Sequence, residues 1–433
     1  MIHIKYLSFL FLLIISVIQN SLCLLPPEFE WKVIDFAWQP GHKEVAIATN
    51  AYIPKNNLPT GIARWRDKLF VTIPRWKRGV PASLNYVLVN GSHQQALNPY
   101  PTWADAFVPD GAKSVSSAST VVSAFRVHVD KCDRLWVVDN GATNMCENVR
   151  QIAPPAIVVF DLKRDTLKFK HFFNDAVLRD ATVFSSIAVD IVDNDCRNTY
   201  AYVADMGAGA LVVYDLQHDT SWRLEHTHFQ FQQNASEYHV GGIDFFWHDG
   251  VSSLALSQVA SDGHRDLYCY PTSSTKMLKI STKLLRNPQF TPQDIQNGVE
   301  VVGEKGPQSQ STACDFDSKN NVLFYTELSK NGVGCWNLDR PFNPENTQLL
   351  ISDCVALEYP NDIKMDMDGN VWILSDRQAR FLYDRMDFNQ INFRVLSAES
   401  TALISGTRCQ LSIIERAIAY IKKTGECAHS AAS

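Results

Sequence analysis

The chain has 433 residues, of which 45% are hydrophobic and 20% are charged, and its formal net charge is −6 at pH 7. Acidic and basic residues are interspersed, so the chain lacks the basic stripe that nucleic acid binding requires, and we expect no nucleic acid partner. This length suits two or three ordinary domains or one large repeat domain.

Residues 1–23 have the features of a secretory signal peptide. Lys5 precedes the apolar run "LSFLFLLIISVI" (Leu7–Ile18), and polar and small residues follow it. This run is shorter than the roughly 20 apolar residues of a membrane helix, and no later stretch approaches that length. We therefore predict cleavage after Cys23, a secreted chain and no membrane partner. Two glycosylation sequons fit a secreted chain, at Asn90 and Asn234.

A pair of short strand-like elements recurs six times along the chain. The second elements are residues 68–72, 134–139, 200–205, 253–257, 322–327 and 371–376. The first elements are residues 60–65, 125–130, 185–190, 241–246, 312–317 and 361–366. A third element follows several of them, at residues 156–162, 210–216, 332–338 and 379–385. The spacing of the repeats is that of four-stranded units joined by loops of variable length.

The elements are rich in β-branched and aromatic residues and are separated by Asp, Asn and Gly, which is typical of antiparallel strands joined by turns. One such sheet cannot bury its own faces, but six sheets packed around an axis bury one another. We predict an all-β, six-bladed β-propeller over residues 24–410. A β-sandwich would need linkers between domains, and no Pro/Gly/Ser-rich linker is present.

Two terminal segments lie outside the repeats. Residues 27–38 are expected to supply the outer strand that closes the ring. Residues 411–423 have apolar residues near helical spacing, so we expect a C-terminal helix that packs on the propeller, with a tail to residue 433.

Nine of the ten cysteines remain after cleavage, in a compartment where disulfides persist. Cys132 and Cys196 lie in equivalent turns of neighbouring repeats and are predicted to pair. Cys335 and Cys409 form a second predicted pair, which would tie the end of the chain to the propeller. The partners of the other five stay open, namely Cys146, Cys269, Cys314, Cys354 and Cys427. The chain has no CxxC or paired Cys/His spacing, so we predict no such metal site.

Several long stretches resemble one family, the insect Yellow / major royal jelly protein family: residues 58–87, 125–141, 154–162, 333–338 and 386–396. The resemblance runs from about Trp31 to Cys409. It implies a secreted six-bladed propeller, found among cuticle pigmentation proteins, dopachrome tautomerases, salivary binders of biogenic amines and nutritive proteins. Because these proteins share a fold but differ in function, the site has to decide the function.

The first element of each repeat is predicted to line the central channel of the propeller, so its leading residues should meet at one opening. Asp362 is the only carboxylate among them and is predicted to pair with the ammonium of a small aromatic amine. The other predicted ligand-binding residues are Thr60, Phe125, Ser185, Gln310, Thr312, Tyr359 and Asn361. The alternative is that these polar groups only cap strand ends around water.

Tautomerisation of an aminochrome moves protons from carbon to oxygen, which requires a base and an acid but no cofactor. We predict Asp362 as the base. His239, beside the expected inner strand of the fourth repeat, is the predicted acid/base partner, and His128 is a weaker candidate. The "PNDI" run at residues 360–363 also resembles the calcium-contacting turn of lactonase propellers. The equivalent positions in other repeats are Thr, Ser or Gly, so we predict no metal.

Three functions remain open from the sequence. The favoured one is a secreted tautomerase acting on dopachrome or dopamine-derived aminochrome in melanin and cuticle pigmentation. The second is a protein that binds serotonin or dopamine without turnover. The third is a structural or nutritive extracellular protein.

Overall fold

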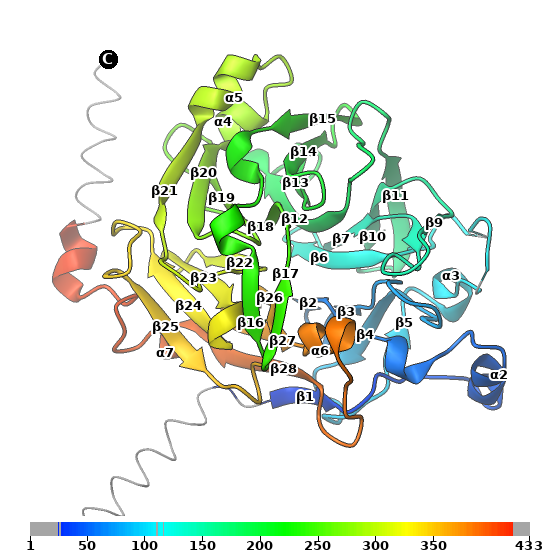
Figure 1. The fold of residues 1–433 in the computed structure, drawn as a ribbon. Helices are drawn as coiled ribbons and strands as arrows, with labels where there is room; N and C mark the ends of the chain where they lie inside the picture. Colours follow the sequence, from blue (N-terminus) through cyan, green and yellow to red (C-terminus); the bar gives the residue numbers. More distant parts are fainter. Residues whose placement is uncertain (1–24, 26, 110, 116, 419–433) are drawn as a thin grey trace, which may run out of the picture.

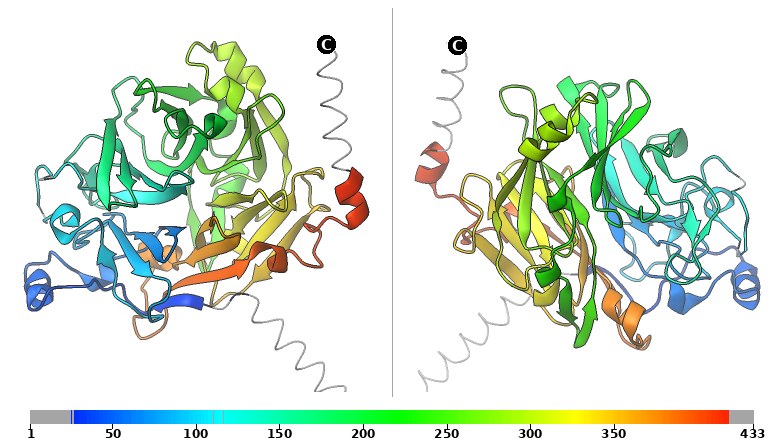
Figure 2. Two further views of the ribbon diagram at one scale, coloured as in Figure 1. Left: turned by 180° about the vertical axis from the view of Figure 1, so that it is seen from behind. Right: turned by 45° about the horizontal axis from the view of Figure 1, so that its top comes forward.

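The structure is a computed structural model that describes residues 25, 27–109, 111–115 and 117–418. Six four-stranded antiparallel sheets follow one another around a central axis in chain order, which confirms the six-bladed β-propeller (Figure 1). Two further views show the sheets packed face to face around that axis (Figure 2). The predicted signal peptide and the tail from residue 419 onwards lie outside the described residues.

In each blade the strands follow one another from the axis outwards. The first two blades are β2 (Gly61–Trp65), β3 (Lys68–Thr72), β4 (Leu84–Leu88) and β5 (Asn98–Pro99), then β6 (Ala124–Asp130), β7 (Arg134–Asp139), β10 (Ala156–Asp161) and β11 (Thr166–Phe172). The next two are β12 (Phe184–Ile191), β13 (Thr199–Asp205), β14 (Ala210–Asp215) and β15 (Thr220–Glu225), then β18 (Val251–Leu256), β19 (Asp266–Pro271), β20 (Lys276–Ser281) and β21 (Val299–Glu304). The last two are β22 (Cys314–Asp317), β23 (Val322–Glu327), β24 (Gly332–Asn337) and β25 (Thr347–Ser352), then β26 (Pro360–Met365), β27 (Asn370–Ser375), β28 (Phe393–Glu399) and β1 (Pro27–Trp31).

The first strand of the chain closes the ring, as expected for residues 27–38. β1 pairs antiparallel with β28, with Trp31 opposite Phe393 and Phe29 opposite Val395. All four of these side chains are buried in one apolar cluster with residues of the first blade. The two ends of the propeller are thereby joined by hydrogen bonds and by a shared core.

Aspartates at the ends of inner strands hold the first turn of several blades. The Trp136 indole donates to Asp130 (2.7 Å), and the Trp372 indole donates to Asp366 (2.8 Å). Both aspartates also accept backbone N–H groups of their own turns. These carboxylates therefore have structural roles, because each one satisfies buried donors where two strands meet.

The predicted register of the fourth repeat was wrong. Residues 241–246 do not form its inner strand; β16 (Glu237–Val240) and β17 (Ile243–Phe246) form a separate hairpin. The inner strand is β18, which was predicted as the second one. The hairpin has the same alternation of aromatic and β-branched residues as a blade strand. Gly241 and Gly242, with φ of +61° and +79°, form the two-residue turn that such hairpins prefer.

The predicted third strand of the sixth repeat was also wrong. Residues 379–385 overlap a helix, α6 (Gln378–Tyr383), and the third strand is β28. Arg377 precedes this helix in a left-handed conformation, and Gln378, Ala379 and Phe381 are buried. The run is short enough to fit a strand or a short helix, and only its packing decides between them.

Short elements lie in the connections between strands, both within and between blades, and after the last strand. They are α2 (His42–Ala48), α3 (Trp103–Ala106), α4 (Thr282–Leu285), α5 (Pro292–Gly298), α7 (Ser400–Leu403), β8 (Ala142–Thr143) and β9 (Arg150–Gln151). Five 3₁₀ turns in the described residues are η1 (Pro54–Asn56), η2 (Val192–Asn194), η3 (Thr227–Phe229), η4 (Gln233–Ala235) and η5 (Leu328–Lys330). No helix in the described part of the chain is long and apolar enough to cross a membrane.

Both predicted disulfides are confirmed. Cys132–Cys196 joins the first turns of the second and third blades, and Cys335–Cys409 joins β24 to the segment after α7. Four described cysteines are free: Cys146 and Cys354 are exposed, and Cys269 and Cys314 are buried. Cys427 lies outside the described residues.

The C-terminal segment is only partly attached to the propeller. Residues 413–418 are helical, and Glu415 lies 2.5 Å from Arg340 of the fifth blade. Ile413 and Ile414 are 81% and 72% exposed, so the apolar face expected to pack on the propeller is open to solvent in these residues.

Candidate functional site

A cavity of about 400 Å³ lies where the inner strands begin. This volume is within the usual range for small-molecule sites. Phe125, Ser252, Thr312 and Tyr359 reach it from the starts of four inner strands or the residues just before them. Loops and α6 around its mouth add the aromatic side chains Trp76, Trp247 and Tyr383. The predicted common opening of the inner strands is therefore a cavity with several aromatic side chains in its walls.

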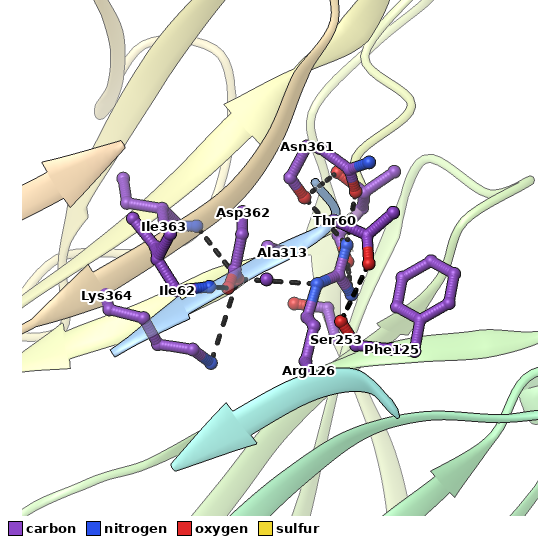
Figure 3. Close-up of polar contacts among 12 residues, drawn as sticks. Thr60, Ile62, Phe125, Arg126, Ser253, Ala313, Asn361, Asp362, Ile363 and Lys364 are labelled. Atoms are coloured by element: carbon purple, nitrogen blue, oxygen red, sulfur yellow. Dashed lines mark hydrogen bonds and ion pairs between the residues drawn. The ribbon is translucent and has the colours of Figure 1, made fainter. Parts of the chain in front are cut away.

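Arg126, on β6, lines this cavity and lies within a network of polar contacts to other blades (Figure 3). Its Nη1 donates to the backbone oxygens of Thr312 (2.9 Å) and Ser252 (3.4 Å). Its Nη2 donates to the backbone oxygen (2.7 Å) and the side-chain oxygen (3.0 Å) of Asn361. Three blades besides its own thus supply the acceptors of one buried guanidinium.

Asp362 lies behind Arg126 and is not among the residues that line the cavity. Its Oδ1 is 3.4 Å from Arg126 Nε and accepts from the Ile363 N–H (3.0 Å), and its Oδ2 accepts from the Ile62 N–H (2.9 Å) (Figure 3). The Lys364 ammonium lies 3.8 Å away. The carboxylate is completely buried and already has its cation, so this geometry does not favour the predicted contact with a ligand ammonium.

A different carboxylate faces the cavity. Asp249 lies in the loop between the β16–β17 hairpin and β18, and it is partly buried beside Trp247. No hydrogen bond or ion pair to another described side chain satisfies its carboxyl. Burial alone raises its pKa from 3.8 to about 6. An ionisable group in a cleft with a perturbed pKa and no protein partner is a candidate for binding or catalysis.

Sequence reasoning missed Asp249 because the fourth repeat was misread. With β18 as the inner strand, Asp249 precedes it by two residues, just as Glu358 precedes β26. The correct register would have placed a carboxylate at the leading end of that strand.

Tyr359 is one of the residues that line the cavity. It has a left-handed backbone, with φ of +65°, at the point where the chain enters β26. Its hydroxyl accepts a hydrogen bond from Gln378 Nε2 (3.2 Å), and Gln378 Oε1 accepts from Asn361 Nδ2 (2.7 Å). Burial raises the pKa of Tyr359 well above its ordinary value, so this group stays protonated. Because the hydroxyl is the acceptor in its bond with Gln378, its O–H is available to donate a hydrogen bond to a bound ligand.

The other predicted ligand-binding residues divide into two groups. Phe125 and Thr312 line the cavity, as Tyr359 does, whereas the side chains of Asn361 and three further residues do not. The Thr60 hydroxyl donates to the Phe125 carbonyl (2.9 Å), and Gln310 donates to the Glu237 carbonyl (2.9 Å) below the hairpin. The remaining one is Ser185, whose hydroxyl lies 3.5 Å from the Ser252 carbonyl. These polar groups hold the cavity wall in place.

The predicted position of His239 was wrong. It lies on β16, outside the inner strands, with a side chain that is 68% exposed and 2.6 Å from Asp244. His128 lies further along β6, where burial and the Lys364 charge lower its pKa to about 3. Neither histidine lines the cavity. Asn90 and Asn234 are exposed, and glycosylation at these sequons stays a prediction.

An arch of two insertions crosses the mouth of the cavity. The β16–β17 hairpin, inserted between the third and fourth blades, meets α6 of the sixth blade (Figures 1 and 2). Phe245 stacks on Tyr383 with ring centroids 5.2 Å apart, and the Trp247 indole donates to the Tyr383 hydroxyl. Arg380 of α6 donates to the Gly241 carbonyl (2.7 Å). The arch restricts the opening and joins directly to the loop that holds Asp249.

The sequence profile described as "Major royal jelly protein" matches residues 122–409. The chain belongs to the major royal jelly protein family. Its relatives in this family include Protein yellow of Drosophila yakuba, which is 35% identical over 392 residues, 89% of this chain and 71% of that one. Another is the Dopaminechrome tautomerase of Drosophila melanogaster, 34% identical over 397 residues, 88% of this chain and 83% of that one.

Proposed function

We propose that this member of the major royal jelly protein family is a secreted tautomerase that converts an aminochrome into a dihydroxyindole during pigment formation. Asp249 carries the proposal: it is an unpartnered carboxyl with a pKa of about 6 in a cavity with aromatic walls. The relative named Dopaminechrome tautomerase supports the same reaction type. The two disulfides fit the oxidising environment of a secreted protein.

The reaction moves protons within one molecule. An aminochrome has two quinone oxygens and two saturated ring carbons; as the five-membered ring becomes aromatic, each carbon loses a proton and each oxygen gains one. In each of the two proton shifts, the Asp249 carboxylate takes a proton from a saturated carbon and then gives it up, while a quinone oxygen gains one proton from solvent. The Tyr359 hydroxyl donates a hydrogen bond to that oxygen and keeps its own proton, so both side chains end as they began. Electrons stay within the substrate, so the step balances without an external oxidant. A base with a pKa near 6 is ionised at neutral pH and still basic enough to work.

The cavity suits a flat bicyclic substrate. Two aromatic pairs line the cavity: the ring centroids of Trp76 and Phe125 lie 5.3 Å apart, and those of Trp247 and Tyr359 lie 6.0 Å apart. Aromatic walls bind a flat ring with an electron-poor or cationic nitrogen through stacking and cation–π attraction. The arch over the mouth would limit the access of water to the reactive quinone.

The test is the loss of aminochrome colour with purified protein and with two aspartate variants. We expect Asp249→Asn to lower kcat at least a hundredfold, since an amide cannot accept the proton. Asp244→Asn is the matched control, because Asp244 lies on the neighbouring hairpin with a 79% exposed side chain. It should keep full activity. Folded wild-type protein that gives no rate above buffer would rule out the proposal.

Binding without turnover is the second candidate function, and the same carboxylate favours it. A partly buried carboxylate without a cation gains stability when a ligand ammonium pairs with it. Calorimetric titration with dopamine and serotonin tests this function, and Asp249→Asn should weaken binding at least tenfold. Protein that neither binds these amines nor turns over an aminochrome would leave only a structural or nutritive role.

A further inference from the structure

We infer that the cavity selects aminochromes without a ring carboxylate, which come from amines, over those with one, which come from amino acids. This inference rests on the proposed function and adds the charge class of its substrate. It is carried by the three charged side chains that line the cavity: Asp249, Arg126 and Lys77. A substrate carboxylate would need one of the two cations, Arg126 or Lys77, as its partner.

Arg126 has no terminal N–H group left for a substrate. Nη1 donates to the backbone carbonyls of Ser252 and Thr312, and Nη2 donates to the backbone and side-chain oxygens of Asn361. Nε makes no hydrogen bond within the described residues, but it is buried and lies 3.4 Å from Asp362 Oδ1. The Asp362 carboxylate behind it also offsets its charge. Arg126 therefore cannot form the two parallel hydrogen bonds by which arginine usually grips a carboxylate.

Lys77 is held at the rim by α6. Its Nζ donates to the Phe381 carbonyl (2.8 Å) and lies 4.0 Å from the centre of the Phe381 ring. Lys77 also lines two neighbouring surface grooves, so it lies at the border between these grooves and the cavity. Burial is the sole cause that raises the pKa of Asp249, with no contribution from Lys77 or any other cation. No cation therefore compensates the charge of the Asp249 carboxylate when it is ionised.

The position of the carboxylate in an amino-acid-derived aminochrome would bring it close to the negative charge of Asp249. In an amino-acid-derived aminochrome the carboxylate is bonded to one of the two saturated carbons from which protons leave. A base that reaches either carbon is then within about 5 Å of that carboxylate, where like charges in a partly dry cavity repel strongly. The amine-derived compound has only hydrogen at this carbon. The geometry that serves catalysis therefore disfavours the carboxylated substrate.

The experiment compares kcat/KM for dopaminechrome and dopachrome in the wild type and in a charge variant. We expect dopaminechrome to be favoured at least tenfold. Met206 lines the cavity, and its carbonyl accepts from the Gly250 N–H (2.9 Å), next to Asp249. Met206→Lys should lower the preference at least threefold by supplying the missing cation. Met367→Lys is the control, because Met367 is 62% exposed in the turn after β26 and does not line the cavity, and it should keep the wild-type preference.

Inhibition of the wild type gives a second measurement that does not depend on a variant. The product analogue 5,6-dihydroxyindole should inhibit at least tenfold more tightly than 5,6-dihydroxyindole-2-carboxylate. Equal kcat/KM values for the two aminochromes, or equal inhibition by the two indoles, would overturn the inference and leave the tautomerase intact. Folded protein that turns over neither aminochrome would instead reject the proposed function itself.

Discussion

Arg126 and Asp362 form an ion pair at the centre of the propeller, with Nε 3.4 Å from Oδ1 and side chains that are 1% and 0% exposed. The two residues come from the second and sixth blades, far apart in the chain. Their neighbours add backbone donors and acceptors from the other blades. The pair therefore couples the blades to one another and separates the cavity from the rest of the channel.

Replacing Asp362 by Asn should lower the free energy of unfolding by about 3–5 kcal/mol, because it leaves the Arg126 charge buried without its anion. Urea denaturation near neutral pH measures this. Asp368→Asn is the control: Asp368 pairs with Arg64 in the turn after the same strand but is 67% exposed, so little change is expected. Unchanged stability together with loss of amine binding would contradict this prediction and would support direct pairing of Asp362 with a ligand ammonium.

Asp249→Asn should make the protein more stable near neutral pH. Folding raises the pKa of this carboxyl from 3.8 to about 6. Between these two pH values the carboxyl is mostly ionised in the unfolded chain but mostly protonated in the folded protein. The wild type therefore loses stability as the pH rises from about 4 to 6, up to about 3 kcal/mol, and Asn removes this loss. Thermal unfolding of both proteins should give equal stability at acid pH and a gap above pH about 6. A wild type that is the more stable protein at neutral pH would contradict the prediction.

The rate of aminochrome conversion should depend on the ionisation of the same group. Only the carboxylate can accept a proton, so kcat/KM should rise with pH through an apparent pKa of about 6 and then level off. Below that pKa the rate should fall about tenfold for each pH unit. A profile that is flat between pH about 5 and 7, in protein that stays folded, would exclude Asp249 as the base.

The fold could be predicted from the sequence because its signals are local. Turns such as the one after Asp366, where the carboxylate accepts both backbone and Trp372 donors, repeat along the chain. The prediction of the inner strand in the fourth repeat was wrong, because the residues around Gly241 have a strand pattern but form an inserted hairpin. Local pattern cannot tell such a hairpin from a blade, since the difference lies in what each strand pairs with.

The site could be predicted only in part, because it depends on distant contacts. The leading ends of the inner strands do meet, and Phe125, Thr312 and Tyr359 do line the cavity. Nothing in the residues around Asp362 reveals that Arg126 neutralises it, since the two come together only when the ring closes. Once that pair is known, Asp249 stands out as the carboxylate in the cavity with no cation.

Loss of the disulfide between the second and third blades should destabilise the propeller. Cys132 and Cys196 are 64 positions apart, and a cross-link that closes a loop of this length contributes about 2–4 kcal/mol. The double variant Cys132→Ala/Cys196→Ala should show this loss in urea denaturation, with activity retained in the folded protein. Cys146→Ala, which removes an exposed free thiol, is the control for the loss of cysteine itself. Equal stability of all three proteins would mean that blade packing alone fixes this junction.

Alanine variants of Gly241 and Gly242, in the turn of the β16–β17 hairpin, test whether the arch controls access of substrate to the cavity. A Cβ at Gly241 would lie 2.2 Å from Glu358 Oε1, whereas a Cβ at Gly242 would meet no atom within 4 Å. Glu358 cannot easily move away, because Arg380 holds the same oxygen at 2.5 Å.

Both Gly→Ala variants share the strain of a positive φ, about 1–2 kcal/mol. Only Gly241→Ala should displace the hairpin from α6, so it should raise KM for the aminochrome several-fold while Gly242→Ala leaves KM unchanged. Equal KM values for the two variants would show that the arch does not control the opening.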